Sequence, residues 1–327
     1  MFKYIVKRFL HFIPLILGMT FVSFLIIKLA PGDFLTSLRM NPSISEETIK
    51  ALEKSYGLNE PLIKQYFLWL WNALHFNLGY SFSYHRPVLS LIGERVGNTL
   101  SLTVTAFIVS WLVAVPLGIV AAYYRNRFVD RIITSFSLIG LSIPSFFLAF
   151  ILMFLAAKTG WFPIGGVVSQ NYESLSVLGK IVDRLKHMFI PLTAMVVGGI
   201  SGLVRLIRGT VIEELEKEYV KLAVAKGLPV RVILFKHVLR NALNPFITLI
   251  GFDIAGLLSG AALIEIITAW PGMGRLMFDA VMAQDFFVVM GALYIGGIML
   301  IIGNLMADIL LALNDPRIRE KEIEGRL

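Results

Sequence analysis

The 327-residue sequence has no cysteine and few charged side chains, and each shortage limits what the chain can be. Without cysteine, neither disulfide bonds nor thiolate metal sites can form. Charged residues make up 16% of the chain and hydrophobic residues 57%, and the mean hydropathy is +0.76. Soluble domains seldom have this composition, so the sequence predicts an integral membrane protein.

Signatures of catalysis are also absent from the sequence. No G-x-x-x-x-G-K-[ST] phosphate loop occurs in the chain, so it carries no recognisable ATP-hydrolysing site. The five histidines form no H-E-x-x-H or comparable cluster, and no G-x-S-x-G turn is present. We therefore expect no catalytic residue, no metal site and no cofactor in this chain.

Six stretches are long and apolar enough to cross a bilayer, which takes roughly 20 mostly apolar residues. They are Phe9–Leu29, Thr99–Tyr123, Ile132–Ala157, Met188–Ile207, Phe246–Ile267 and Phe287–Leu313. Basic residues precede the first, as in a secretory signal, but no A-x-A-like cleavage site follows, so we expect a retained span. The predicted fold is all-α, a polytopic membrane helical bundle with six transmembrane helices.

The distribution of lysine and arginine predicts the orientation of the bundle. These residues concentrate in the segments that lie inside if the N-terminus is inside, so we expect both termini in the cytoplasm. The net charge of +8 then reflects the inner membrane face and anionic lipid, not nucleic acid. Residues 1–98 would form the first span and an extracytoplasmic helical cap, residues 99–313 a five-helix core with a cytoplasmic loop at 208–245, and residues 314–327 a cytoplasmic tail.

Two short helices are predicted in the outer cap. Ser43 or Ser45 can cap a helix that begins at Glu46 and stops at Gly57. A second helix would start near Pro61 and run through two tryptophans to about Phe76. It is too short and too polar to span, and its aromatic residues suit a helix lying against the bilayer interface.

The predicted cytoplasmic loop contains two further helices joined at a glycine corner. Thr210 and Glu213 have the spacing of a capping box, which would start the first helix within the loop. Gly227 followed by Pro229 is a helix stop. We expect the second helix over residues 230–243, ended by Asn244-Pro245 before the fifth span.

Two interpretations of this loop are open from the residues alone. It could be an amphipathic hairpin on the lipid headgroups, with its lysines against anionic lipid. Alternatively, the corner could insert into a protein socket. The acidic residues clustered in the first helix and the small apolar surface expected at the corner favour the socket.

Charged residues inside membrane spans are candidates for function. Asp253 lies about two turns into the fifth span, Glu265 near its outer end and Asp308 near the inner end of the sixth. Asp253 could face a watery cavity and meet a substrate amine, or pair with a basic residue of a partner subunit. Glu265 could line the pathway or fix the turn before Trp270, and Asp308 could reach the interface or the basic tail. Pro144 is expected to kink the third span.

Small residues recur in the last two spans and predict close helix contacts, either within the bundle or with a second subunit. They are Gly251, Gly256, Gly260, Gly291, Gly296, Gly297 and Gly303.

Segments along almost the whole chain resemble one transporter family. Glu218-Tyr219-Val220, Ala223-x-Ala225-Lys226-Gly227-Leu228 and Leu239-Arg240-Asn241-Ala242-Leu243-x-Pro245 are similar to the EAA coupling loop of ATP-binding-cassette importer permeases, in the form of the oligopeptide, dipeptide and nickel family. Matching segments elsewhere include Leu78-Gly79-Tyr80-Ser81-Phe82, Ser142-Ile143-Pro144-Ser145-Phe146, Trp270-Pro271-Gly272-Met273-Gly274-Arg275 and Asp315-Pro316-Arg317. The long first outer loop resembles that of the B-type subunit.

This resemblance implies a type I, MetI-like permease in a prokaryotic inner membrane. It implies a heterodimer with a related C-type permease, two ATPase subunits that bind ATP and Mg²⁺, and an extracytoplasmic binding protein. The coupling loop would dock on an ATPase through Glu218, Tyr219, Ala223, Ala225, Lys226, Gly227 and Leu228. From their positions inside the predicted spans, and not from the resemblance, the candidate translocation-pathway residues are Asp253, Glu265 and Pro144.

Several substrates and one different mechanism stay open at this point. Peptides are the first expectation, and the same machinery could import nickel chelates or oligosaccharides. The rival mechanism is an ion-gradient-driven secondary transporter that uses Asp253 and Asp308. Such transporters show inverted repeats and broken helices at mid-membrane, and the sequence indicates neither clearly.

Overall fold

The computed structural model describes residues 2–29, 45–55, 60–257 and 262–314. Its helices are α1 (Phe2–Leu29), α3 (Glu46–Ser55), α4 (Leu62–Leu74), α5 (Val88–Tyr123), α6 (Phe128–Ser142), α7 (Ser145–Thr159), α8 (Val177–Leu215), α9 (Glu218–Ala225), α10 (Val230–Val232), α11 (Leu239–Gly256), α12 (Ala262–Ile267), α13 (Met273–Met282) and α14 (Phe286–Asn314). A 3₁₀ turn covers Tyr172–Ser174, and a π-helix, Ile233–Val238, joins α10 to α11. Strands β1 (Tyr80–Ser81) and β2 (Arg86–Pro87) form an antiparallel hairpin, with Tyr80 opposite Pro87.

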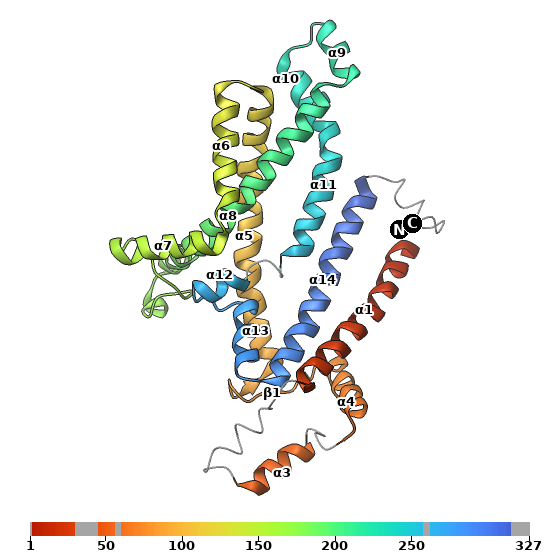
Figure 1. Ribbon diagram of the computed structural model, residues 1–327, viewed down its shortest axis with the longest axis vertical. Coiled ribbons are helices and arrows are strands. Elements are labelled where there is room, and N and C mark those ends of the chain that lie inside the picture. The colour runs from red at the N-terminus through yellow and green to blue at the C-terminus, as the bar shows by residue number, and fades with distance from the viewer. Residues whose placement is uncertain (1, 30–44, 56–59, 258–261, 315–327) are drawn as a thin grey trace.

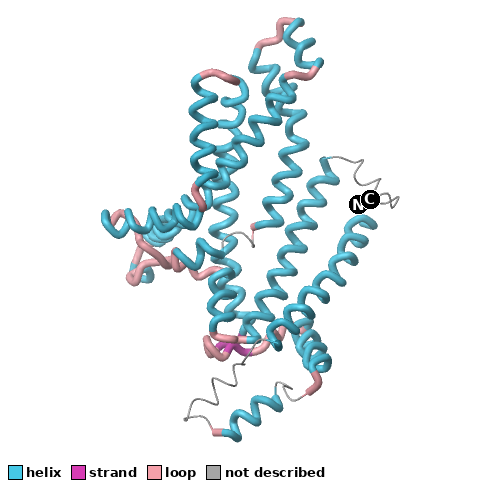
Figure 2. Tube along the Cα trace, in the orientation of Figure 1, coloured by secondary structure: helices cyan, strands magenta, loops and turns pink. Residues whose placement is uncertain are grey.

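Four of the predicted spans are continuous helices, and the all-α polytopic bundle is confirmed. By length and composition, α1, α5, α8 and α14 could each cross a membrane. Helix α5 packs along α8 and α11 along α14, which also packs against α1 (Figure 1). The short helices α9 and α10 project at one end of the bundle, and α3 and α4 lie at the opposite end (Figures 1 and 2).

The third predicted span is not one helix. Helices α6 and α7 are bent by 92° at a break between Ser142 and Ser145, and the pair counts as a fifth span only if both halves belong to one. Proline disfavours helical geometry at the residue before it and lacks the N–H that a continuing helix needs. Ile143 is accordingly extended, and Pro144 becomes the N-cap of α7. The kink expected at Pro144 is thus a complete break between two helices.

The fifth predicted span is also divided. Helix α11 ends at Gly256 and α12 begins at Ala262, while residues 258–261, including Gly260, lie outside the described residues. The expectation that Asn244-Pro245 ends the preceding helix is wrong, because α11 runs through Pro245 without interruption. A proline inside a membrane helix can be tolerated when neighbouring groups and local helix adjustments accommodate the lost hydrogen bond.

Close helix contacts occur at several of the predicted glycines. A Cβ atom on Gly251 would lie 3.0 Å from the Ala307 methyl of α14, and one on Gly297 would lie 2.4 Å from Met19 of α1. Helices α5 and α8 also approach closely at a glycine outside the predicted set, because a Cβ on Gly118 would lie 2.7 Å from Ile207. The long helices therefore approach each other more closely than larger residues would allow.

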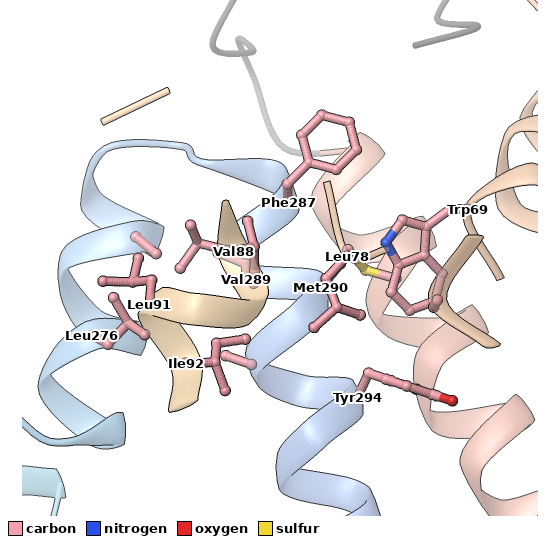
Figure 3. Packing of buried hydrophobic residues seen from close by; sticks show 14 of the residues in the cluster. Trp69, Leu78, Val88, Leu91, Ile92, Leu276, Phe287, Val289, Met290 and Tyr294 are labelled. Carbon is pink, nitrogen blue, oxygen red and sulfur yellow. The ribbon is translucent and has the colours of Figure 1, made fainter. Parts of the chain in front are cut away.

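A buried core joins α4, the β-hairpin and the ends of α5 and α14 (Figure 3). The predicted cap helices are present as α3 and α4, although Ser43 and Gly57 lie outside the described residues. Tyr66 on α4 lies 3.0 Å, oxygen to oxygen, from Thr20 on α1, and both are buried. The inner face of α4 thus packs on the bundle, whereas Phe67 and Trp71 on its outer face are exposed.

Asp285 connects the hairpin to the start of α14. Its fully buried carboxylate accepts hydrogen bonds from the Ser81 hydroxyl at 2.7 Å and the Ser83 N–H at 3.1 Å. It also accepts one from the Val288 N–H at 3.4 Å, the third residue of α14, as an N-cap residue does. Gly79 has φ +91°, and a Cβ there would lie 2.5 Å from Phe287, so only glycine fits.

We predict that Asp285→Ala lowers the free energy of unfolding by about 2 kcal/mol, because three hydrogen-bond donors, two of them buried, lose their acceptor. Chemical unfolding in detergent micelles, followed by circular dichroism, measures this change. The control is Glu173→Ala, which removes only an exposed ion pair with Lys180. Equal stability of the two variants would contradict the assigned role of Asp285.

Candidate functional site

The corner between α9 and α10 is built on a left-handed glycine. Gly227 has φ +69°. Its N–H donates to the Val224 carbonyl at 2.9 Å, and the Leu228 N–H donates to the Ala223 carbonyl at 3.3 Å. These two bonds are those of a Schellman motif, which ends a helix and satisfies its last carbonyls. The predicted helix stop at Gly227 is confirmed, and Pro229 then precedes the first turn of α10.

The start of the corner differs from the prediction. Thr210 lies inside α8, and its hydroxyl donates to the Leu206 carbonyl at 3.1 Å, so the predicted capping box is not formed. A capping box needs an N-terminal helix end, whereas α8 continues for another turn to Leu215.

A buried carboxylate fixes α9 against the end of α8. Glu214 accepts hydrogen bonds from the Lys217 ammonium at 2.5 Å and from the Tyr219 hydroxyl at 2.6 Å. The hydrogen bond to Glu214 raises the pKa of Lys217, and burial raises the pKa of the Tyr219 phenol. Both side chains therefore stay protonated at neutral pH and hold the turn between the two helices.

The expected coupling residues divide into an inner and an outer group. Ala223 is buried with Val220 in a core that includes residues of α8 and the π-helix, so its methyl group is not open to a partner. Tyr219 is half-buried. Glu218, Ala225, Lys226, Gly227 and Leu228 are exposed. Glu218 pairs with Lys221 at 2.7 Å, and this hydrogen bond raises the pKa of Lys221.

The corner carries an exposed apolar tip, which we define as Leu222, Val224, Leu228 and Val230. Leu222 is 62% exposed, Val224 60% and Val230 48%. The expectation of little apolar surface at the corner is therefore wrong. No atom lies within 4 Å of the position that a Gly227 Cβ would occupy, so the corner is open around the glycine. Large exposed apolar side chains gathered at one corner are typical of an interaction site.

Two ion pairs that the sequence pattern did not reveal join the end of α8 to the α5–α6 turn and the start of α6. Arg208 on α8 donates from Nε and Nη2 to the two carboxylate oxygens of Asp130, at 2.6 and 2.7 Å. Asp130 is buried and also accepts the Asn126 N–H. Arg125 pairs with Glu216 just beyond α8. The bidentate geometry fixes α6 to α8.

A cavity of about 460 Å³ lies between α5, α8 and α11. Its described lining comprises Thr103, Ala106, Phe107, Ser110, Trp111, Met195, Gly198, Gly199, Gly202, Leu203, Asp253, Gly256 and Leu257. A Cβ on Gly198, Gly202 or Gly256 would meet no atom within 4 Å, so these glycines leave space open. Asp253, predicted as a pathway residue, lies in this wall, and its Oδ2 accepts the Trp111 indole N–H at 2.8 Å.

Continuous helices link the cavity to the corner. Helix α8 carries the cavity glycines in its middle and ends at Leu215, beside α9. On the other side, helical backbone runs from Val230 through the π-helix and α11 to Gly256. The two walls of the cavity are thus extensions of the two helical arms of the corner.

The other predicted pathway residues lie elsewhere. Glu265 on α12 is fully buried against the turn between α12 and α13, where Thr99 donates to it at 2.6 Å and the Gly274 N–H at 2.7 Å. A Cβ on Gly272 would lie 2.2 Å from its carboxyl group. This geometry agrees with the alternative in which Glu265 fixes the turn. Pro144 lies at the exposed bend, and neither it nor the partly buried Asp308 belongs to the described cavity wall.

Together, these features define a polytopic helical membrane protein with a cavity between its long helices and an exposed apolar tip at one end. Residues 114–320 match the family described as binding-protein-dependent transport system inner membrane component, and residues 1–103 match its N-terminal component. The chain belongs to this family, and it is a multi-pass protein of the inner membrane.

Full-length relatives are similar along almost the whole chain. The oligopeptide transport system permease protein AppB of Bacillus subtilis (strain 168) is 39% identical over 97% of this chain and 99% of its own length. A putative peptide transport system permease protein of Brucella abortus (strain 2308) is 35% identical over 96% and 98%, respectively.

A solved structure supports the fold. The MetNI methionine ABC transporter in inward-facing conformations contains a chain that superposes with a TM-score of 0.50 and 15% identity, covering 68% of this chain and 97% of that one. At this identity the likeness concerns the fold alone, and it confirms the ABC-importer permease fold expected from the sequence.

We predict that Gly227→Ala weakens the corner by about 1 kcal/mol, because an alanine Cβ is unfavourable at positive φ. The backbone N–H groups of residues 227 and 228 donate the two Schellman hydrogen bonds, and their hydrogen exchange should become about fivefold faster. Gly209→Ala is the control, since Gly209 lies in helical backbone of α8 with open space around it. Unchanged exchange at the corner would contradict the strain argument.

Proposed function

We propose that this chain is the permease subunit of an ATP-driven importer and forms half of a translocation pore for di- and oligopeptides. Its partners are a related C-type permease, two ABC ATPase subunits and an extracytoplasmic binding protein that delivers the peptide. ATP and Mg²⁺ bind to the ATPases, and this chain holds no cofactor. Both termini and the corner lie in the cytoplasm, and the α3–α4 end faces outward.

The observation that carries this proposal is the exposed apolar tip at a rigid glycine corner. Family membership makes an ATPase the partner that such a tip would meet. Leu222, Val224, Leu228 and Val230 supply apolar contact area, and Gly227 lets a partner approach the backbone closely. Ala225 and Lys226 add a small and a charged contact, while Tyr219 and Ala223 support the tip from within.

Docked in this way, the tip transmits movement of the ATPase to the pore. The arms α8 and α11 reach from the corner to opposite sides of the cavity, so a displacement at the tip changes the separation of the cavity walls. A small shift at one end of packed, rigid helices is amplified into a change between inward and outward openings.

Peptide is the substrate that the relatives favour. Two full-length relatives are named as oligopeptide or peptide permeases, which supports peptide over nickel chelates or oligosaccharides. The cavity wall is also suited to varied side chains, since it is mostly glycine and apolar residues. Membership in the binding-protein-dependent family supports ATP over an ion gradient as the energy source, despite the broken helix at Pro144.

Val224→Asp tests the docking of the tip. A carboxylate at the centre of an apolar interface should weaken ATPase association by about 1–3 kcal/mol, so ATP-driven uptake should fall about fivefold or more. Uptake is measured in vesicles containing the complete transporter, together with the amount of ATPase that copurifies. Glu213→Gln, on the exposed surface of α8 outside the tip, is the control. Wild-type uptake by Val224→Asp, or uptake driven by a proton gradient without ATPase, would refute the proposal.

Gly202→Leu tests the cavity as the pathway. A Cβ at this position meets no atom within 4 Å and Gly202 lines the cavity, so we expect the protein to fold and the passage to narrow. Uptake should fall several-fold, more for longer peptides, while ATPase activity persists. Gly209→Leu is matched, because Gly209 is on the same helix with equally open surroundings but outside the described cavity wall. An equal effect of both variants would argue against a pathway here.

A further inference from the structure

Asp253 is the one charged side chain in the described wall of the cavity. It lies on α11, opposite Ser110 and Trp111 of α5, and the rest of the described wall is apolar or carries only small hydroxyl groups. A carboxylate in such surroundings is costly within a membrane, and charged groups that persist there mark substrate or ion pathways.

The described side chains occupy only one acceptor position of this carboxylate. The Trp111 indole N–H donates to Oδ2 at 2.8 Å, and no described basic side chain forms an ion pair with Asp253. An ionised carboxylate can accept about four hydrogen bonds. The remaining acceptor positions are open to the cavity, because Asp253 is exposed.

Two further aromatic rings lie near Trp111. The Trp111 ring lies 6.2 Å from the Phe107 ring and 6.4 Å from the Phe246 ring, centre to centre. Because the indole N–H lies in the plane of the ring, Asp253 contacts the ring edge, and its negative charge makes the position suitable for a cation. An anionic or uncharged polar group would not gain from this charge.

We infer that the Asp253–Trp111 pair binds the free α-ammonium group of the peptide as it passes through the cavity. This inference rests on the proposed function. Every unmodified peptide carries that ammonium group whatever its sequence, whereas its side chains vary. A single fixed carboxylate among glycines and apolar residues therefore orients the common end of the substrate and leaves the variable side chains unselected.

Direct binding tests this site without relying on transport. The purified assembly of both permeases and both ATPases, with no binding protein, is dialysed against radiolabelled tri-alanine or N-acetyl-tri-alanine. The wild type should prefer the free amine at least tenfold. Asp253→Asn, which keeps the volume and an acceptor for Trp111, should lose that preference, while its weak affinity for the acetylated peptide stays unchanged.

Two further variants separate charge recognition from a structural role. Asp253→Glu should restore part of the preference, because the charge is retained. Trp111→Phe keeps an aromatic ring but removes the N–H, so it should reduce the preference less than Asp253→Asn does. Equal loss of affinity for both peptides in Asp253→Asn would instead indicate a structural role, such as an ion pair with the second permease, and would overturn the inference.

The remaining outcomes also decide the question. If the wild type binds both peptides equally, or neither, the inference is wrong. If N-acetyl-Ala-Lys-Ala binds as well as tri-alanine, the site recognises any cation and the assignment to the peptide terminus is wrong. Failure of the proposed function looks different, because amine-selective binding would persist while the same assembly, reconstituted with its binding protein, showed no ATP-driven uptake.

Discussion

The structure depends on the requirement that backbone polar groups inside a membrane be hydrogen-bonded within the protein, which favours long uninterrupted helices. Helix α8 has 39 residues and is therefore about 58 Å long at 1.5 Å per residue. It begins beyond the cavity and ends at the corner, so no flexible joint separates the two. The arm on the other side contains a π-helix, Ile233–Val238, but its helical backbone is likewise unbroken from Val230 to Gly256.

Several interactions keep these arms from moving independently of their neighbours. The Asp130–Arg208 pair joins α6 to α8, and the closely packed glycines Gly118 and Gly199 hold α8 against α5. At the other end, Glu265 and Asp285 tie α12, α13 and the β-hairpin to α5 and α14 through buried hydrogen bonds. The cavity with its open glycines and Asp253 lies between these braced groups.

The sequence alone predicts the helical class, four of the spans, the glycine corner and Asp253 as a wall residue, because each depends on local composition or on a single turn. It fails where a local signal has two outcomes. Pro144 breaks a helix and Pro245 does not, and the difference depends on how neighbouring backbone accommodates the missing N–H. The sequence also does not predict the Asp130–Arg208 ion pair, because its partners are 78 positions apart. Nor does it predict the exposed tip, because the exposure of Leu222 and Val224 depends on how α9 packs.

The central claim is that the corner and the cavity walls move together. Because the sequence contains no cysteine, pairs of introduced cysteines provide unique spin labels. Electron paramagnetic resonance of the spin labels would measure one distance along α8, between positions 206 and 213, and one distance across the cavity, between positions 107 and 257. Both would be measured in the complete transporter, with and without a non-hydrolysable ATP analogue. The account predicts that the distance across the cavity changes while the distance along α8 stays constant. A constant distance across the cavity, or a changed distance along α8, would contradict it.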